Sequence, residues 1–234
     1  MSPPRRDDRP LLVVNLKNYG EALGEGALRI ARAAEEVSRR TGVPIMVAPP
    51  QVALMYVARS VSIPVLAQHV DDVEPLNTTG FVPPESVAAS GAAGSIINHS
   101  EHRLPEEVVG RLVARMRALG LISVVCAATP EEAARLARFS PDYIAIEPPE
   151  LIGTGRAVSR VAPEVVSRGV EAVRSASADV GVLCGAGITG GEDVRAALEL
   201  GAMGVLVSSA VVRSPDPRAK MEEMARSALE VRRA

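Results

Sequence analysis

Short apolar runs recur along this chain, with polar, helix-like segments between them. There are eight such runs, at residues 11–14, 45–48, 63–67, 93–97, 122–126, 143–146, 180–184 and 205–207. They are continuously apolar rather than alternating, as expected of parallel strands that are buried on both faces. The pattern therefore predicts eight parallel strands and fits an antiparallel sandwich poorly.

The segments between the runs carry helical periodicity and helix-start signals. Within residues 105–120 the apolar side chains fall on one stripe, Pro105 stands at a first helical position, and Gly120 ends the stripe. Thr129 and Thr189 each precede a glutamate by three residues, an arrangement that caps helix starts. Further helices are expected at residues 21–40, 163–176 and 215–232, with shorter ones after Pro50 and Pro83.

This order of elements predicts the fold class, an α/β protein with one catalytic domain over residues 11–234. Eight strand–helix units without a Pro/Gly/Ser-rich linker close into a (β/α)8 barrel. The alternative is a doubly wound open sheet, which normally has a G-x-G-x-x-G turn after its first strand. Residues 15–18, Asn-Leu-Lys-Asn, contain no such turn, so the pattern favours the barrel. Residues 1–10 are expected to form a solvated N-terminal tail.

The composition excludes some classes of protein and of binding partner. The 234 residues are 47% hydrophobic and 23% charged, with a formal net charge of -2, which excludes a mainly disordered protein. An aromatic content of 2% and the lack of basic excess argue against a nucleic-acid partner. No uncharged run can span a membrane and no signal peptide is recognisable, so a cytoplasmic protein is expected. Cys126 and Cys184 lie in apolar runs and are expected to be buried free thiols.

The candidate chemistry lies where the strands end, because barrels of this kind place their active sites at the carboxyl ends of the strands. The polar or small residues at these ends are Asn15, Lys17, Gln68, His69, Asn98, His99, Ser100, Glu101, Glu147, residues 185–187, Ser208 and Ser209.

Three of these residues suggest catalysis. Lys17 is one of only two lysines beside 24 arginines, and a compact ammonium suits an anionic substrate; the alternative is a solvated loop lysine. Glu147 ends an apolar strand, where burying a carboxylate costs free energy unless the group has a functional role or a partner. It is therefore the candidate general base; the alternative is an ion pair with an arginine. His99 is placed to polarise a carbonyl, although a lone histidine is more often structural. His69 and His102 are interpreted as structural.

Two segments suggest how a substrate is held. Residues 148–155, Pro-Pro-Glu-Leu-Ile-Gly-Thr-Gly, have two prolines, an apolar tip and two glycines, which is the composition of a hinged lid that excludes water. Residues 185–187 and 208–210 are small, so their amides can approach a phosphate, as happens after the last two strands of many barrels. Ordinary tight turns are the alternative.

Taken together and in order, four motifs resemble the signatures of the triosephosphate isomerase family in its shorter archaeal form. They are Asn-Leu-Lys at 15–17, Asn-His-Ser-Glu-His-Arg at 98–103, residues 145–155 and Leu-Cys-Gly-Ala-Gly-Ile at 183–188. The likeness runs from Leu11 to the end of the chain. It implies a TIM barrel that interconverts glyceraldehyde 3-phosphate and dihydroxyacetone phosphate in glycolysis and gluconeogenesis, without cofactor or metal.

The resemblance also implies a role for each matching residue. Glu147 would move a proton between neighbouring carbons through an enediolate, and a neutral His99 would donate to the enediolate oxygen with help from Lys17 and Asn15, the acid–base pattern that this family exemplifies. Glu101 matches the position that holds the lysine. The positions that match substrate-binding ones, mainly for the phosphate, are Ile152, Gly153, Gly187, Ser208 and Ser209.

The same resemblance bears on assembly and on rival functions. Residues 77–81, Asn-Thr-Thr-Gly-Phe, resemble the loop through which these subunits dimerise, so Phe81 is expected at an interface. The resemblance therefore implies a homo-oligomer, which in the archaeal form is a homotetramer.

Two other functions are alternatives to this one. One alternative is another phosphate-binding barrel, a synthase, which would lack the combination of Lys17, His99 and Glu147. A catalytically silent scaffold is the other, and it would have no reason to keep them.

Overall fold

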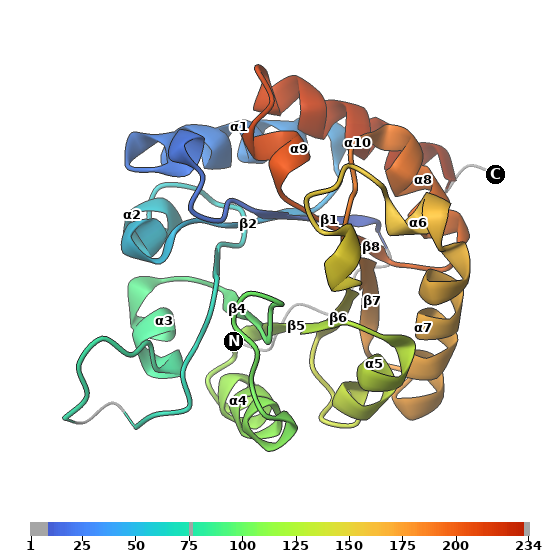
Figure 1. Ribbon diagram of the computed structural model, residues 1–234. Helices are drawn as coiled ribbons and strands as arrows, with labels where there is room; N and C mark the ends of the chain where they lie inside the picture. Colours follow the sequence, from blue (N-terminus) through green and yellow to red (C-terminus); the bar gives the residue numbers. More distant parts are fainter. Residues whose placement is uncertain (1–8, 75–76, 232–234) are drawn as a thin grey trace.

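The computed structural model describes residues 9–74 and 77–231, and in this part of the chain eight parallel strands form one sheet in the order β2-β1-β8-β7-β6-β5-β4-β3. The two outer strands meet through a parallel bridge between Val47 and Val65. The sheet is therefore a closed barrel with helices around it, as predicted (Figure 1). The strands are β1 (Leu11–Asn15), β2 (Ile45–Ala48), β3 (Leu66–Ala67), β4 (Gly94–Ile97), β5 (Ile122–Ala127), β6 (Tyr143–Ile146), β7 (Gly181–Cys184) and β8 (Gly204–Val207).

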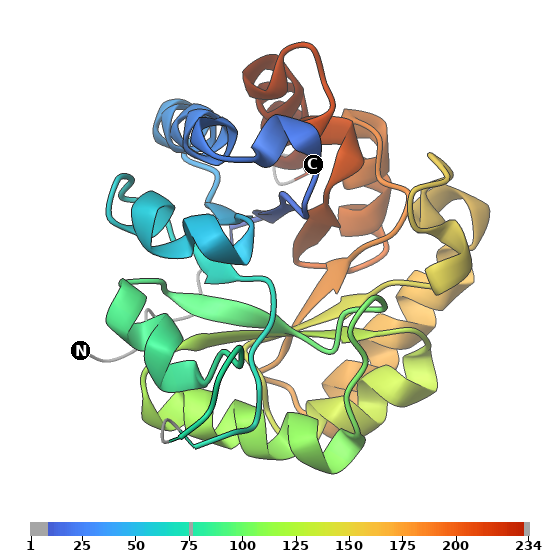
Figure 2. The same ribbon diagram turned by 60° about the vertical axis from the view of Figure 1, so that its left-hand side comes forward.

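Helices surround the barrel and cover its outer face (Figure 2). The long ones begin and end close to the predicted positions, and residues 163–176 match the expectation at both ends. The α-helices are α1 (Glu25–Thr41), α2 (Leu54–Ala58), α3 (Pro84–Ser90), α4 (Glu106–Ala118), α5 (Pro130–Ala137), α6 (Val158–Val161), α7 (Pro163–Ala176), α8 (Gly191–Glu199), α9 (Ser209–Val212) and α10 (Pro217–Val231), and the 3-10 helices are η1 (Gly20–Ala22), η2 (Gln51–Ala53) and η3 (Pro149–Leu151).

Two separate apolar clusters explain why the strands form continuous apolar runs in the sequence. The inner cluster fills the barrel with side chains that include Leu11, Val13, Ala145 and Leu206. Their neighbours in sequence belong to the larger cluster between strands and helices, as Leu12 does. Because both faces of each strand are buried, the inward and the outward positions are both apolar, and the sequence does not distinguish them.

The expected helix start at Thr189 is wrong, whereas the one at Thr129 is confirmed. The Thr129 hydroxyl accepts from the Glu132 amide at 3.2 Å at the start of α5. At α8, the amide and the hydroxyl of Thr189 both donate to Asp193, at 2.8 and 2.6 Å. The helix begins at Gly191 with Gly190 at its N-cap, one residue later than a Thr189 cap would give, and the Thr189 hydroxyl donates to Asp193 instead of accepting from a helix amide.

Two other boundaries differ from the prediction for identifiable backbone reasons. The expected helix at residues 21–40 is divided into η1 and α1, because Gly24 between them has a φ of +53° that interrupts helical geometry. The expected strand at residues 63–67 forms a continuous strand only at its last two residues; before them Val65 makes a single bridge to Val47, and Pro64 has no amide hydrogen to donate.

Two further expectations concern the N-terminal tail and the absence of a membrane-spanning helix. Most of the expected tail at residues 1–10 lies outside the described residues; Arg9 is exposed and Pro10 is buried. Among the helices that the structure describes, none is both long enough and apolar enough to cross a bilayer.

Candidate active site

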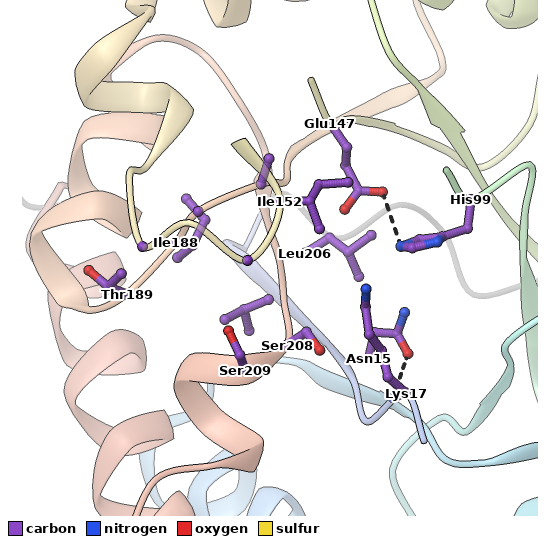
Figure 3. A pocket seen from close by; sticks show the side chains of 15 residues that line it. Asn15, Lys17, His99, Glu147, Ile152, Ile188, Thr189, Leu206, Ser208 and Ser209 are labelled. Carbon is purple, nitrogen blue, oxygen red and sulfur yellow. Dashed lines mark hydrogen bonds and ion pairs between the residues drawn. The ribbon is translucent and has the colours of Figure 1, made fainter. Parts of the chain in front are cut away.

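The inward positions of the strands continue directly into a cavity at their carboxyl ends. On β6, Ala145 belongs to the inner cluster, so Glu147 is the next inward position. The same step of two takes Leu206 to Ser208 after β8, and Asn15 holds the corresponding place on β1. The barrel geometry therefore brings together side chains that are far apart in sequence (Figure 3).

His99 reaches the cavity by a different route. The residue before it, Asn98, has a φ of +61°, in the left-handed region that asparagine tolerates better than most side chains. The Asn98 side chain is used for bracing, since its amide nitrogen donates to the Cys126 carbonyl at 3.0 Å and its Oδ1 accepts from the Leu104 amide at 2.9 Å. The turn at Asn98 carries the next side chain, His99, into the cavity.

The hydrogen bonds of His99 define which ring nitrogen faces the cavity as a donor. The Glu101 amide donates to Nδ1 at 3.2 Å, so the hydrogen of a neutral imidazole lies on Nε2. Nε2 is 4.0 Å from Glu147 Oε2. The residue is only 7% exposed. A neutral imidazole in this position can donate a hydrogen bond into the cavity.

Lys17 is held by three neighbours. Its φ is +45°, and its amide donates to Asn15 Oδ1 at 2.9 Å, which stabilises the turn after β1. Gln68 Nε2 donates to the Lys17 carbonyl at 3.0 Å. The ammonium donates to Glu101 at 2.8 Å, and this contact holds the pKa of the Glu101 carboxyl below its usual range. Glu101 thus keeps the ammonium at the edge of the cavity without entering the cavity itself.

Glu147 has the environment of a reactive carboxylate. It is 6% exposed, and within the described residues its Oε2 has no hydrogen-bond partner. A side chain at Gly185 would come within 2.3 Å of Glu147 Cγ, so the glycine after β7 leaves the space that the carboxylate occupies. Figure 3 shows Glu147 and His99 facing each other across the cavity.

The two cysteines are buried free thiols, as expected. Burial, followed by the nearby charge of Glu147, holds the pKa of Cys126 well above its usual value. Burial likewise raises the pKa of Cys184 to about 12. Both thiols are therefore neutral at physiological pH, which excludes them as thiolate nucleophiles.

The segment expected to be a lid lies beside Glu147. Leu151 is buried, while Ile152 at the tip lines the cavity beside Glu147. Gly153 and Gly155 have φ values of +74° and +71°, a conformation that favours glycine. The predicted composition of two rigid prolines and two permissive glycines thus corresponds to the backbone geometry of this segment.

The opposite side of the cavity is lined by small residues. Gly187 has a φ of +73°, and a side chain there would come within 2.0 Å of the Arg156 carbonyl, so the position requires glycine. Ser208 precedes α9 but its side chain makes no capping bond, and its buried Oγ has no hydrogen-bond partner among the described residues. Ser209 lies beside it (Figure 3). The unpartnered Ser208 hydroxyl is a donor available to a ligand.

Most predicted site residues line this single cavity. They are Asn15, Lys17, His99, Glu147, Ile152, Gly153, Gly187, Ser208 and Ser209, joined by Ala186, Ile188, Thr189 and Leu206. His69 and His102 lie outside it, in a neighbouring cavity that shares Lys17 and His99.

Several side chains brace the site, and one of them, Gln51, is not among the residues predicted from the strand ends. Gln51 after β2 accepts from the Gln68 amide at 3.3 Å, and Gln68 also donates to the Ala48 carbonyl at 3.0 Å. Arg103 forms an ion pair with Glu132, which ties the loop after β4 to the loop after β5. Gln51 could have been found by the signal that marked the other candidates, a polar side chain soon after an apolar strand.

Comparison with known proteins gives a consistent result. Residues 10–227 match the family model described as triosephosphate isomerase. The chain is 50% identical to the triosephosphate isomerase of Cenarchaeum symbiosum over 218 residues, covering 93% of this chain and 97% of that protein. The corresponding protein of Methanothermus fervidus is 46% identical over 93% of this chain and 98% of its own length. That of Methanopyrus kandleri is 51% identical over 89% and 93%.

Proposed function

Since this chain belongs to the triosephosphate isomerase family and interconverts D-glyceraldehyde 3-phosphate and dihydroxyacetone phosphate, we propose that Glu147, His99 and Lys17 are its catalytic residues. The observation that supports this assignment most strongly is the shared cavity, in which the carboxylate, the imidazole and the ammonium all face the same space.

Glu147 is the general base in this proposal. Its carboxylate takes a proton from the carbon beside the substrate carbonyl, which leaves an enediolate, and then returns a proton to the neighbouring carbon. The buried Oε2 suits this role, because it makes no hydrogen bond with the described residues and is therefore available to a substrate in the cavity.

His99 and Lys17 stabilise the charge that develops on the substrate oxygens. Neutral His99 donates from Nε2 to the enediolate, an assignment that follows from the Glu101 amide donating to Nδ1. The Lys17 ammonium supplies a fixed positive charge near the same oxygens and the phosphate, and the Asn15 side chain adds polar contact. Glu101 acts as a positioning residue for Lys17.

The remaining lining residues bind the phosphate and shield the intermediate. We assign the phosphate to the main-chain amides of Gly187, Ser208 and Ser209, which follow the last two strands, and to the unpartnered Ser208 hydroxyl. Ile152 and Gly153 form the tip of a lid over Glu147. An enediolate phosphate exposed to water tends to expel its phosphate, so a closed lid would protect the intermediate.

Replacing Ser208 with alanine tests the phosphate assignment. A hydrogen bond to a charged group contributes about 1.5–3 kcal/mol, so kcat/KM for glyceraldehyde 3-phosphate is expected to fall by about 10- to 100-fold. Turnover of unphosphorylated glyceraldehyde should not change, and thermal stability should be equal or higher because a buried hydroxyl without a partner is removed. Both substrates are measured in an assay coupled to dihydroxyacetone phosphate or dihydroxyacetone reduction.

The same assay separates the proposed function from its rivals. Rapid isomerisation of glyceraldehyde 3-phosphate by the wild-type chain is the expected result. A phosphate-binding synthase or a silent scaffold would show no such rate. If Ser208→Ala slows both substrates equally, the hydroxyl does not contact the phosphate.

We also propose that the protein is a homo-oligomer, with a tetramer favoured by the family resemblance. Phe81, in the loop between β3 and α3, is 54% exposed, and Val52, in the 3-10 helix η2 after β2, is 97% exposed. Phe81 is thus available for the contact that the family resemblance of its loop implies. Sedimentation equilibrium is expected to give two or four times the chain mass of 24.5 kDa, and Phe81→Asp should lower it. A wild-type mass of one chain would contradict this proposal.

We propose that the protein acts in the cytoplasm. Support for it comes from the glycolytic reaction, whose charged sugar phosphates do not cross membranes unaided.

A further inference from the structure

A cluster of two histidines and an aspartate lies beside the catalytic cavity, and the proposed reaction does not use it. His69 and Asp71 belong to the loop after β3, and His102 belongs to the turn after β4. One ligating atom from each of the three side chains lies within 4.8 Å of the others. His69 Nε2 and Asp71 Oδ1 are 3.1 Å apart. This is about the separation of two ligands on one tetrahedral ion, since zinc–nitrogen and zinc–oxygen bonds are about 2.0–2.2 Å long.

Two of the three groups are already held in place by the backbone. The second oxygen of Asp71 accepts from the Val82 amide at 2.7 Å, and the Asp71 amide donates to the Val82 carbonyl at 2.9 Å. The His69 carbonyl accepts from Gln51 Nε2 at 3.1 Å. The fold therefore holds the Asp71 carboxylate and the His69 backbone in place before any ion binds.

The third group is the movable one. The His102 ring stacks on His69 with centroids 3.5 Å apart and an angle of 8° between the planes. Two parallel stacked rings cannot both direct an in-plane nitrogen at one ion, so His102 must turn away from the stack to ligate. His102 is exposed, which makes that movement easy.

The charge state of the cluster also suits a cation. Nearby charges are paired elsewhere: Asp72 with Arg111 at 2.7 Å and Lys17 with Glu101 at 2.8 Å. The Asp71 carboxylate, which contacts the His69 ring and the Val82 amide, can neutralise part of the charge of a divalent ion.

We propose that His69, Asp71 and His102 form an accessory binding site for Zn²⁺ that joins the loop after β3 to the turn after β4. Two imidazoles and one carboxylate, with water as a fourth ligand, are a donor set that zinc favours over magnesium or calcium. Binding at His69 Nε2 requires any hydrogen on that nitrogen to move to Nδ1 or to leave to solvent. The site is separate from the isomerase chemistry and would stabilise the two loops.

Zinc titration of the untagged full chain tests this site. Isothermal calorimetry with ZnCl₂ is expected to show one ion per chain, and the ion should raise the melting temperature because it binds only the folded protein. His102→Gln and Asp71→Asn should each weaken binding at least about tenfold and abolish the rise in melting temperature. In the Asp71→Asn variant the side-chain carbonyl oxygen can still accept from the Val82 amide, so the loop is not expected to lose its anchor.

The matched control is the chain's third histidine. His99→Gln removes the catalytic imidazole but leaves all three proposed ligands, so it should bind zinc as the wild type does. Loss of zinc binding in His99→Gln with retention in His102→Gln would overturn the proposal, because the ion would then occupy the catalytic cavity. Equal binding in all variants would overturn it as well.

Discussion

Replacing Glu147 with glutamine is expected to lower kcat by about 100- to 10,000-fold, the usual effect of losing a general base. Glutamine has nearly the same shape, and the Oε2 atom that it replaces makes no hydrogen bond with the described residues, so no internal bond of that atom is lost. Melting temperature should therefore stay close to the wild-type value. The measurements are kcat in the coupled isomerase assay and thermal unfolding of both proteins.

A shorter carboxylate gives an independent check on this assignment. Glu147→Asp keeps the base but withdraws it by about one methylene, and misplacement of this size costs about 100-fold in rate. Glu164→Gln, on the exposed start of α7, is the matched control and should retain full activity. Wild-type kcat in Glu147→Gln would show that the base is another group.

Replacing Lys17 with alanine is expected to lower kcat/KM by about 100- to 1,000-fold, as the loss of one preorganised charge-stabilising donor does. Phosphoglycolate, which mimics the enediolate phosphate, should raise the melting temperature of the wild type and leave that of Lys17→Ala unchanged. Lys17→Arg should not restore activity, because the planar guanidinium cannot occupy the place of an ammonium only 19% exposed and held 2.8 Å from Glu101.

The only other lysine of the chain provides the control. Lys220 lies on α10, does not line the cavity, and pairs with Glu223 at 2.7 Å. Lys220→Ala should retain both activity and the response to phosphoglycolate. If Lys17→Ala still responds to phosphoglycolate as the wild type does, Lys17 does not bind the anion.

The candidate residues could be identified from the sequence, because a polar residue follows the apolar run at the end of a strand. Glu147 interrupts an apolar run, and Lys17 stands out among 24 arginines, so both could be named without coordinates. The direction in which each points was not accessible. With both faces of every strand apolar, the sequence offers no contrast between inward and outward positions.

Local backbone geometry accounts for the errors. Asn98 and His99 are adjacent and both polar, and only the left-handed φ of Asn98 decides that the imidazole enters the cavity while the amide braces the neighbouring loop. Thr189 fits a capping pattern, but its amide and hydroxyl donate to Asp193, and Gly190 takes the N-cap position. In both cases the hydrogen bonds of the folded chain, which the short-range pattern does not show, decide where the side chain lies.

The order of strands and helices, the barrel class and the list of polar residues at the strand ends were determined by the sequence alone, since periodicity, capping residues and apolar runs are local properties. Tertiary structure decided which of those residues meet. Closure of the barrel brings Lys17, His99 and Glu147 to one cavity and places His69, Asp71 and His102 together beside it. The physical reason is that proximity between segments tens of residues apart depends on strand register and helix packing, which follow from the burial of the whole core.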